Sequence, residues 1–303
     1  MTHISLWNSP EFAGLRDGVV ERLLVVDHRD DQGRLVGTLS GVVDDSWWVS
    51  GYSAPYGGFD AARPGASVTD VCGMVERCCE VARREALHGI RVRMRPPHSS
   101  PWGANLDFAL FQQGFRVTES DLNFYIDLRS VSSGDEWSTS LRRESRRALR
   151  QVASLGLDVF TLAETDEAGW VEAYDVLRNN RLDKGRPMRL DLDYVRAARD
   201  RFSPGVRMLA IRESGRIIAA ALVYRVGPGE DVVQYWGDHG HQLARSPMPL
   251  LVEAVVEDSA ASGAEFLDIG ISTDHGEPNL GLIQFKKAMG CSTELRVVME
   301  LEL

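Results

Sequence analysis

The chain has 303 residues, a length that fits two domains of about 150 residues each. Hydrophobic residues make up 44% and charged residues 26%, which is the composition of a globular protein that buries a core. The formal net charge of −10 argues against non-specific binding to polyanions, although it leaves room for a local basic patch.

The N-terminal segment, MTHISLWNSPEF, lacks the basic start and the apolar run of a signal peptide. No stretch of the chain approaches 18 apolar residues, the length that a membrane-spanning helix needs. Four cysteines are too few to build a disulfide framework in a chain of this length. We therefore expect a cytoplasmic protein with no membrane span.

The first half of the sequence predicts six elements in order. Two apolar strands flank a tight turn at Asp31-Gln32-Gly33, and a glycine closes each of the two helical patterns. The expected elements are a hairpin over 22–43, an aromatic strand over 47–52, a helix over 68–87, a strand over 90–94, a helix over 107–115 and a strand over 122–128.

The second half repeats this order after two additional helices. The helices are expected over 136–155 and 166–182; the repeat then runs as a hairpin over 206–226, a strand over 232–237, a helix over 249–262, a strand over 265–269, a helix over 280–290 and a strand over 295–303. A polar linker over 130–135 separates the copies. The sequence thus predicts two tandem α/β domains, residues 1–134 and 135–303, each with a mixed sheet.

Three segments carry a resemblance to a known superfamily. They are Ser53-Ala54-Pro55-Tyr56-Gly57-Gly58, the arginine-rich stretch from Leu141 to Arg150, and the late region that runs from Asp268 through Phe285-Lys286 to Gly290. With the order of elements, they resemble the GNAT acetyltransferase unit. The two-unit arrangement resembles the FemAB group of aminoacyl transferases, and no coiled-coil arm is inserted in the second unit.

The resemblance implies a fold of two tandem GNAT-like domains and transfer of an amino acid from aminoacyl-tRNA to an amine. It also implies that Phe285 and Lys286 lie in the active cleft. A fixed lysine stabilises the oxyanion that forms when an amine attacks an ester or thioester, or it holds a substrate phosphate. Asp268, at the end of an apolar strand, is expected to orient or deprotonate the amine, with loop capping as the alternative.

Further residues are expected to bind substrate. They are Phe285, Asn279, Tyr235, Tyr56 and Arg181, and for each a structural role in packing or in an exposed loop remains open. Arg142, Arg146 and Arg150 recur every four residues, and Arg143 and Arg147 stand one step round the helix. These five arginines predict a phosphate-binding face for tRNA, with a solvated face as the alternative.

Two further observations concern cofactors. Pro247 and Pro249 stand where an acyl-CoA-dependent GNAT uses backbone N–H groups to hold the pyrophosphate, and proline has no N–H. We therefore expect no tightly bound cofactor, with aminoacyl-tRNA as co-substrate and acyl-CoA as the alternative. No metal-binding pattern is present.

The sequence predicts an amide-forming acyltransferase or aminoacyltransferase that acts on a small-molecule amine. Two alternatives remain open: an acyl-CoA-dependent N-acyltransferase, and a GNAT-like protein that binds a ligand or partner without catalysis.

Overall fold

The computed structural model describes residues 4–240, 243, 245–274 and 276–303. The chain forms two compact units, and neither is continuous in sequence. Unit 1 contains residues 1–123, 271–278 and 294–303, and unit 2 contains residues 124–270 and 279–293. The domain boundary between residues 134 and 135 stays a prediction, since the last strand of the chain is grouped with unit 1.

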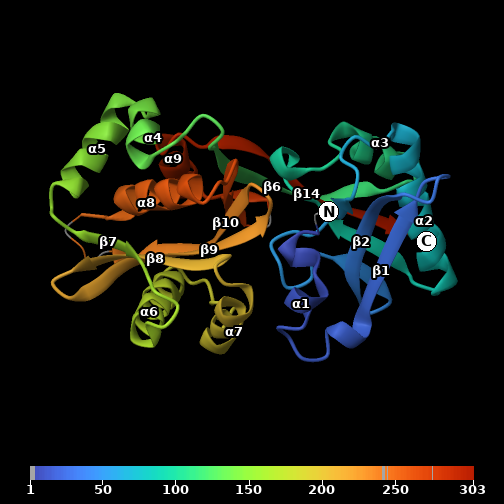
Figure 1. The fold of residues 1–303 in the computed structure, drawn as a ribbon, viewed down its shortest axis with the longest axis horizontal. Helices are drawn as coiled ribbons and strands as arrows, with labels where there is room; N and C mark the ends of the chain where they lie inside the picture. Colours follow the sequence, from blue (N-terminus) through green and yellow to red (C-terminus); the bar gives the residue numbers. More distant parts are fainter. Residues whose placement is uncertain (1–3, 241–242, 244, 275) are drawn as a thin grey trace. The chain divides into compact units, whose positions relative to one another are not determined.

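Unit 1 is a sheet with two longer helices packed on it (Figure 1). Its strands run in the order β1-β2-β3-β5-β14-β6, with β4 paired to β2. The elements are η1 (Leu6–Asn8), α1 (Pro10–Ala13), η2 (Val20–Arg22), β1 (Leu23–Arg29), β2 (Leu35–Asp44), β3 (Trp47–Ser50), β4 (Phe59–Ala61), α2 (Val68–Arg84), β5 (Gly89–Arg93), η3 (Pro97–Ser99), α3 (Ala104–Gln112), the first part of β6 (Arg116–Asp127), the small ladder β12 (Thr273–Asp274) with β13 (Glu277–Pro278), and most of β14 (Ser292–Glu302).

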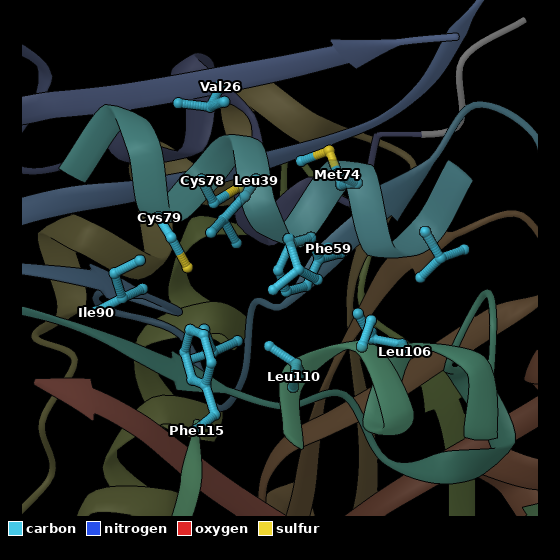
Figure 2. Packing of buried hydrophobic residues seen from close by; sticks show 14 of the residues in the cluster. Val26, Leu39, Phe59, Met74, Cys78, Cys79, Ile90, Leu106, Leu110 and Phe115 are labelled. Atoms are coloured by element: carbon cyan, nitrogen blue, oxygen red, sulfur yellow. The ribbon is translucent and has the colours of Figure 1, made fainter. Parts of the chain in front are cut away.

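The core of unit 1 lies between helix α2 and its neighbours. Met74, Cys78 and Cys79 come from the buried face of α2, and Figure 2 shows them near Leu110 of α3 and Ile90 of β5. All five side chains are at most 1% exposed. Burying such side chains stabilises a fold by about 1.5–3 kcal/mol each, so this face of α2 fixes unit 1.

Unit 2 is a mixed sheet with helices on both faces (Figure 1). Its strands run in the order β6-β11-β10-β9-β8-β7, with α4, α5, α8 and α9 on one face and α6 and α7 on the other. The elements are α4 (Gly134–Ser140), α5 (Arg143–Ala153), β7 (Asp158–Thr161), α6 (Glu167–Asp183), α7 (Leu192–Phe202), β8 (Val206–Glu213), β9 (Arg216–Gly227), β10 (Glu230–Asp238), α8 (Met248–Ala261), β11 (Phe266–Ile271) and α9 (Leu280–Ala288).

The structure confirms both predicted hairpins: β1 pairs with β2, and β8 pairs with β9. Two details of the predicted elements are wrong. The single helix expected over 136–155 is two helices, because the backbone is extended at Leu141 and Arg142. The strand expected from residue 122 begins at Arg116. The strand expected over 295–303 is confirmed as β14, which pairs antiparallel with β5 and so completes the sheet of unit 1.

Candidate active site

The candidate site lies at the carboxyl ends of two parallel strands in unit 2. Strands β10 and β11 pair in register from Glu230–Phe266 to Val232–Asp268, and the pairing stops there. Ligand sites of α/β sheets usually lie at the carboxyl ends of parallel strands, where neighbouring strands part. The residues that follow Val232 and Asp268 therefore lie at the position where α/β sheets usually bind their ligands.

Strand β10 carries a bulge directly after this point. Its register with β9 shifts between Val233 and Tyr235, which leaves Gln234 outside the ladder. The Oε1 atom of Gln234 is inaccessible to solvent, and no donor among the described residues bonds it. A buried acceptor without a donor is uncommon in folded proteins and draws attention to the strand end.

The end of β11 is organised around Gly270. Its φ of +73° is a left-handed conformation that glycine adopts without strain. The Oδ1 atom of Asp268 accepts a hydrogen bond from the Gly270 N–H over 2.6 Å, and the Lys286 Nζ donates to the Gly270 carbonyl oxygen over 2.8 Å. Two side chains of opposite charge type therefore bind the two polar groups of one glycine.

Both of these side chains are buried: Asp268 is 0% exposed and Lys286 is 1% exposed. The Lys286 amine also lies 5.2 Å from the centre of the Phe124 ring, within the range of a cation–π contact. Buried charged groups are costly unless they are hydrogen-bonded or paired. The sequence places these two groups at a strand end despite that cost, which is typical of a functional site.

Helix α9 directs Lys286 inward. Asn279 caps the helix, because its side-chain oxygen accepts a hydrogen bond from the Leu282 N–H over 3.1 Å. The cap fixes the residue at which the helix begins. Leu280, the first residue of the helix, is 66% exposed, whereas Lys286, six residues later, is buried. Asn279 thus has a structural role, and its part in substrate binding stays a prediction.

The charge of Lys286 acts on the thiol of Cys291, which lies just after helix α9. Burial raises the pKa of Cys291 to about 12, and the positive charge of Lys286 acts in the opposite direction. The Cys291 N–H donates to the Lys286 carbonyl oxygen over 3.2 Å, which keeps the two residues adjacent. Cys291 therefore reports on the charge of Lys286.

Aromatic residues surround the carboxyl end of β10. Phe285 and Trp236 meet edge to face with their ring centres 5.9 Å apart, and the Arg181 guanidinium lies 5.0 Å from the centre of the Tyr235 ring. Successive residues of a strand face opposite sides of the sheet, so Trp236 faces α9 and Tyr235 faces α6. Trp236 is not among the site residues predicted from the sequence, although its neighbour Tyr235 in the same aromatic strand was a signal for it.

The site residues predicted from the sequence divide between the units. Lys286, Asp268, Phe285, Asn279, Tyr235 and Arg181 all belong to unit 2. Tyr56 belongs to unit 1, is 1% exposed, and has the Arg296 guanidinium 6.0 Å from its ring centre. These contacts give Tyr56 a packing role in unit 1, and its binding of substrate stays a prediction.

The arginine-rich segment forms a basic helix face in unit 2. Ser145, Leu149 and Val152 form the buried side of α5, whereas Arg143, Arg147 and Arg150 are exposed. Arg146 is half-buried and donates to the Thr139 carbonyl oxygen over 3.2 Å. Arg142 precedes the helix with extended backbone, so the predicted five-arginine face has four members on the helix.

Acidic side chains do not neutralise this face. Within the part of the chain that the structure describes, the arginines of residues 142–150 make no ion pair, although Glu144 is beside them. Other arginines of unit 2 are paired; Arg196 and Arg199, for example, both bind Glu167. The basic helix face, meaning Arg143, Arg146, Arg147 and Arg150, thus keeps its charge available for an anion.

The N-terminus of α8 offers few donors to a pyrophosphate. Pro247 and Pro249 have no N–H, the Met248 N–H donates to the Ser246 Oγ over 3.3 Å, and the Leu251 N–H donates to the Pro247 carbonyl oxygen. In unit 1 the N-terminus of α2 is closed by a reciprocal pair of hydrogen bonds between Ser67 and Asp70. Both helix ends therefore offer fewer open N–H donors than a phosphate site usually has.

Among the described residues, no three His, Cys, Asp or Glu side chains are grouped to hold a metal ion. Also among them, no helix has the length and apolar character to cross a membrane.

Part of the chain matches a protein-family model. Residues 139–286 match the model of the acetyltransferase (GNAT) domain. No curated protein matches the chain in sequence.

Comparison with solved structures extends over nearly the whole chain. The structure of FemX has a TM-score of 0.75 and 12% identity, and the match covers 98% of this chain and 92% of FemX. The C-terminal domain of a protein assigned as lysylphosphatidylglycerol synthetase from Agrobacterium fabrum has a TM-score of 0.60 and 13% identity, with 97% and 87% covered. A tandem GNAT protein from the clavulanic acid biosynthesis pathway has a TM-score of 0.51 and 13% identity, also with 97% and 87% covered. The predicted tandem GNAT fold of FemAB type is thus confirmed.

Proposed function

Since this chain carries a GNAT acyltransferase domain and has the tandem GNAT fold, we propose that it transfers an aminoacyl group from aminoacyl-tRNA to the amine of a small-molecule acceptor. The likeness to FemX, whose match covers 98% of this chain, supports this choice within acyl transfer. So does the basic helix face, which is the feature of the chain that best fits a polyanionic donor.

The reaction is a direct displacement. The acceptor amine attacks the carbonyl carbon of the aminoacyl ester, a C–N bond forms, and the ester C–O bond breaks as the tRNA hydroxyl leaves. The amine loses one proton, and the leaving oxygen gains one. A covalent enzyme intermediate would need a nucleophilic side chain with a base beside it. Direct transfer needs neither group, and it therefore suits the site.

Lys286 and Asp268 are assigned to the reacting centre. The amine of Lys286, held at the Gly270 carbonyl, supplies positive charge at the end of β11, where it stabilises the oxyanion of the tetrahedral intermediate. The Asp268 carboxylate binds the Gly270 N–H and fixes the turn that presents this carbonyl. Its negative charge favours the ammonium form of an acceptor before proton loss.

A second candidate function is acyl transfer from coenzyme A. The match to an acetyltransferase domain favours it. The two prolines and the occupied N–H groups at the start of α8 weigh against it, because they remove the donors that would bind the pyrophosphate. We therefore place aminoacyl-tRNA first.

The proposal is tested by presenting purified protein with total tRNA charged with radiolabelled amino acids. Filter retention at low salt, followed by identification of the retained amino acid, is expected to select one or a few charged tRNAs over the uncharged pool. Retention of the whole pool in proportion to its abundance, or of none of it, would count against an aminoacyl-tRNA donor.

A further inference from the structure

A lysine at the C-terminal end of α6 is held in place by a buried amide. The Lys184 Nζ donates to the Asn180 Oδ1 over 2.7 Å, and the Asn180 Nδ2 donates to the Asp238 carbonyl oxygen over 2.6 Å. Asn180 is only 6% exposed. This amide therefore connects the last residue of β10 to the amine of Lys184, which is an exposed residue.

The packing at this point favours asparagine. A Cβ atom on Gly237 would lie 2.6 Å from the Asn180 Cγ, so the amide rests directly on the backbone of β10. A longer glutamine side chain lacks room there. An aspartate would place a carboxylate against the Asp238 carbonyl oxygen, where no donor would remain to bind it. The position thus requires a short side chain that donates at one end and accepts at the other.

Basic groups collect around the lysine. The Arg181 Nε donates to the Pro187 carbonyl oxygen over 3.1 Å, and the Arg186 N–H donates to the Arg181 carbonyl oxygen over 2.8 Å. These bonds fold the loop back on α6, so that Arg181, Lys184 and Arg186 lie close together. Mutual repulsion of their charges and partial burial of the amine lower the pKa of Lys184, and burial is the larger cause.

The neighbouring acids offset part of this charge. Asp238 favours the protonated lysine, but its two carboxylate oxygens accept hydrogen bonds from the Gly240 N–H over 3.0 Å and from the Ser246 Oγ over 2.6 Å. Asp183 is the other acid that acts on Lys184. Among residues 4–240, 243, 245–274 and 276–303, Lys184 makes no ion pair, and one of its three N–H donors binds Asn180.

We propose that Lys184, together with Arg181, forms a binding site for a phosphate group of a substrate, and that Asn180 is the positioning residue that holds the lysine amine at the carboxyl end of β10. A phosphate would accept hydrogen bonds from the amine and reduce the repulsion between the two cations. This inference depends on the proposed function in one respect, which is that the phosphate belongs to a substrate of the transferase. The phosphate comes either from a small acceptor or from the tRNA.

The probe is inorganic pyrophosphate, titrated calorimetrically at low ionic strength and pH 7. Lys184→Gln is expected to weaken binding at least about tenfold, because it removes a charged donor. Lys184→Arg should keep most of the affinity, and it also guards against loss of fold. Lys287→Gln, which removes an exposed lysine on α9 of the same unit, should have no effect. Equal affinity in the native protein and Lys184→Gln, or no binding by the native protein, would overturn the site.

Asn180→Ala tests the positioning role through the pH profile. In the native protein the affinity for pyrophosphate should decline as pH rises through a Lys184 pKa that lies below the ordinary value of 10.5. In Asn180→Ala the amine returns to solvent, so the decline should move to higher pH and the affinity at pH 7 should fall several-fold. An unchanged midpoint would leave Asn180 with a packing role alone.

Two arms separate the sources of the phosphate and separate this site from the proposed function. If Lys184→Gln weakens pyrophosphate binding but leaves charged-tRNA retention intact, the phosphate belongs to a small acceptor; if both weaken, it belongs to the tRNA. If the native protein retains no charged tRNA but binds pyrophosphate through Lys184, the proposed function fails and this site stands. If tRNA is retained and Lys184→Gln changes neither ligand, this site fails and the function stands.

Discussion

Lys286 donates from its Nζ atom to the carbonyl oxygen of Gly270 over 2.8 Å, and this bond joins the buried side of α9 to the end of β11. Lys286 is 1% exposed, whereas Leu280 on the same helix is 66% exposed. A helix that buries its lysine and exposes a leucine reverses the usual distribution of side chains. This relationship is the strongest structural reason to place the chemistry of the protein at this strand end.

Lys286→Met is expected to lower the rate of transfer by at least about 100-fold, the typical effect of removing one donor that stabilises an oxyanion. Methionine keeps the length of the side chain, so packing changes little. The variant should also lose about 1–3 kcal/mol of stability, because the Gly270 carbonyl is left without its donor. Single-turnover transfer and thermal unfolding measure the two effects.

Lys287→Met is the matched control, because Lys287 is the exposed neighbour on the same helix. It should change neither activity nor melting temperature appreciably. If Lys286→Met loses stability but retains normal transfer, the lysine has only a structural role.

Asp268→Asn separates the charge of Asp268 from its place in the turn. An asparagine oxygen can still accept the hydrogen bond from the Gly270 N–H, so the fold should be retained. The negative charge is lost, and we expect at least about a tenfold loss in transfer, because the ammonium form of the acceptor is no longer attracted to and oriented at the site. Circular dichroism and the transfer rate are the measurements. Normal transfer would show that Asp268 serves the turn alone.

The sequence was most informative about the order of elements. Both hairpins and the helices α2, α8 and α9 followed from apolar periodicity and glycine caps. Periodicity could not reveal that Leu141 and Arg142 break a helix, because neither residue is a strong helix breaker. It also could not place β14 beside β5, since pairing between distant strands depends on tertiary contacts.

The contacts of the site residues could not be predicted from sequence patterns for the same reason. From the sequence alone, the apolar residues Leu282 and Phe285 are expected to make the core contact of the last helix. The structure buries Lys286 more deeply than either residue, so that expectation no longer holds. Asn180, Trp236 and Gly270 gained their roles from contacts across unit 2 that no local pattern contains.

Cys291 provides a test of the charge on Lys286. Burial raises the pKa of this thiol to about 12, so it should remain protonated, and slow to react with iodoacetamide, up to about pH 10. The positive charge of Lys286 favours the thiolate, so Lys286→Met should raise the pKa further and slow alkylation at pH 10. Mass spectrometry of the Cys291 peptide gives the rates. Faster alkylation in a folded variant would contradict a charged Lys286 beside the thiol.

The basic helix face should contribute to binding of charged tRNA through phosphate contacts. Arg143→Gln/Arg147→Gln/Arg150→Gln removes its three exposed arginines and is expected to reduce the slope of log K against log salt by about two to three units. Arg142, which the sequence placed on the same face, lies before the helix and is left unchanged.

The control for this experiment removes three exposed arginines elsewhere in unit 2. Arg178→Gln/Arg201→Gln/Arg216→Gln changes the net charge by the same amount. It should leave the salt slope close to that of the native protein. Equal slopes for all three proteins would show that the basic helix face is solvated and binds no phosphate.

The choice of donor is decided by titrating the native protein with coenzyme A and with charged tRNA, side by side in one buffer at low salt. The prolines and occupied N–H groups at the start of α8, together with the free charge on α5, predict binding of charged tRNA that weakens steeply with salt, and no binding of coenzyme A in the micromolar range. Micromolar binding of coenzyme A with no binding of charged tRNA would contradict the account and make acyl-CoA the donor.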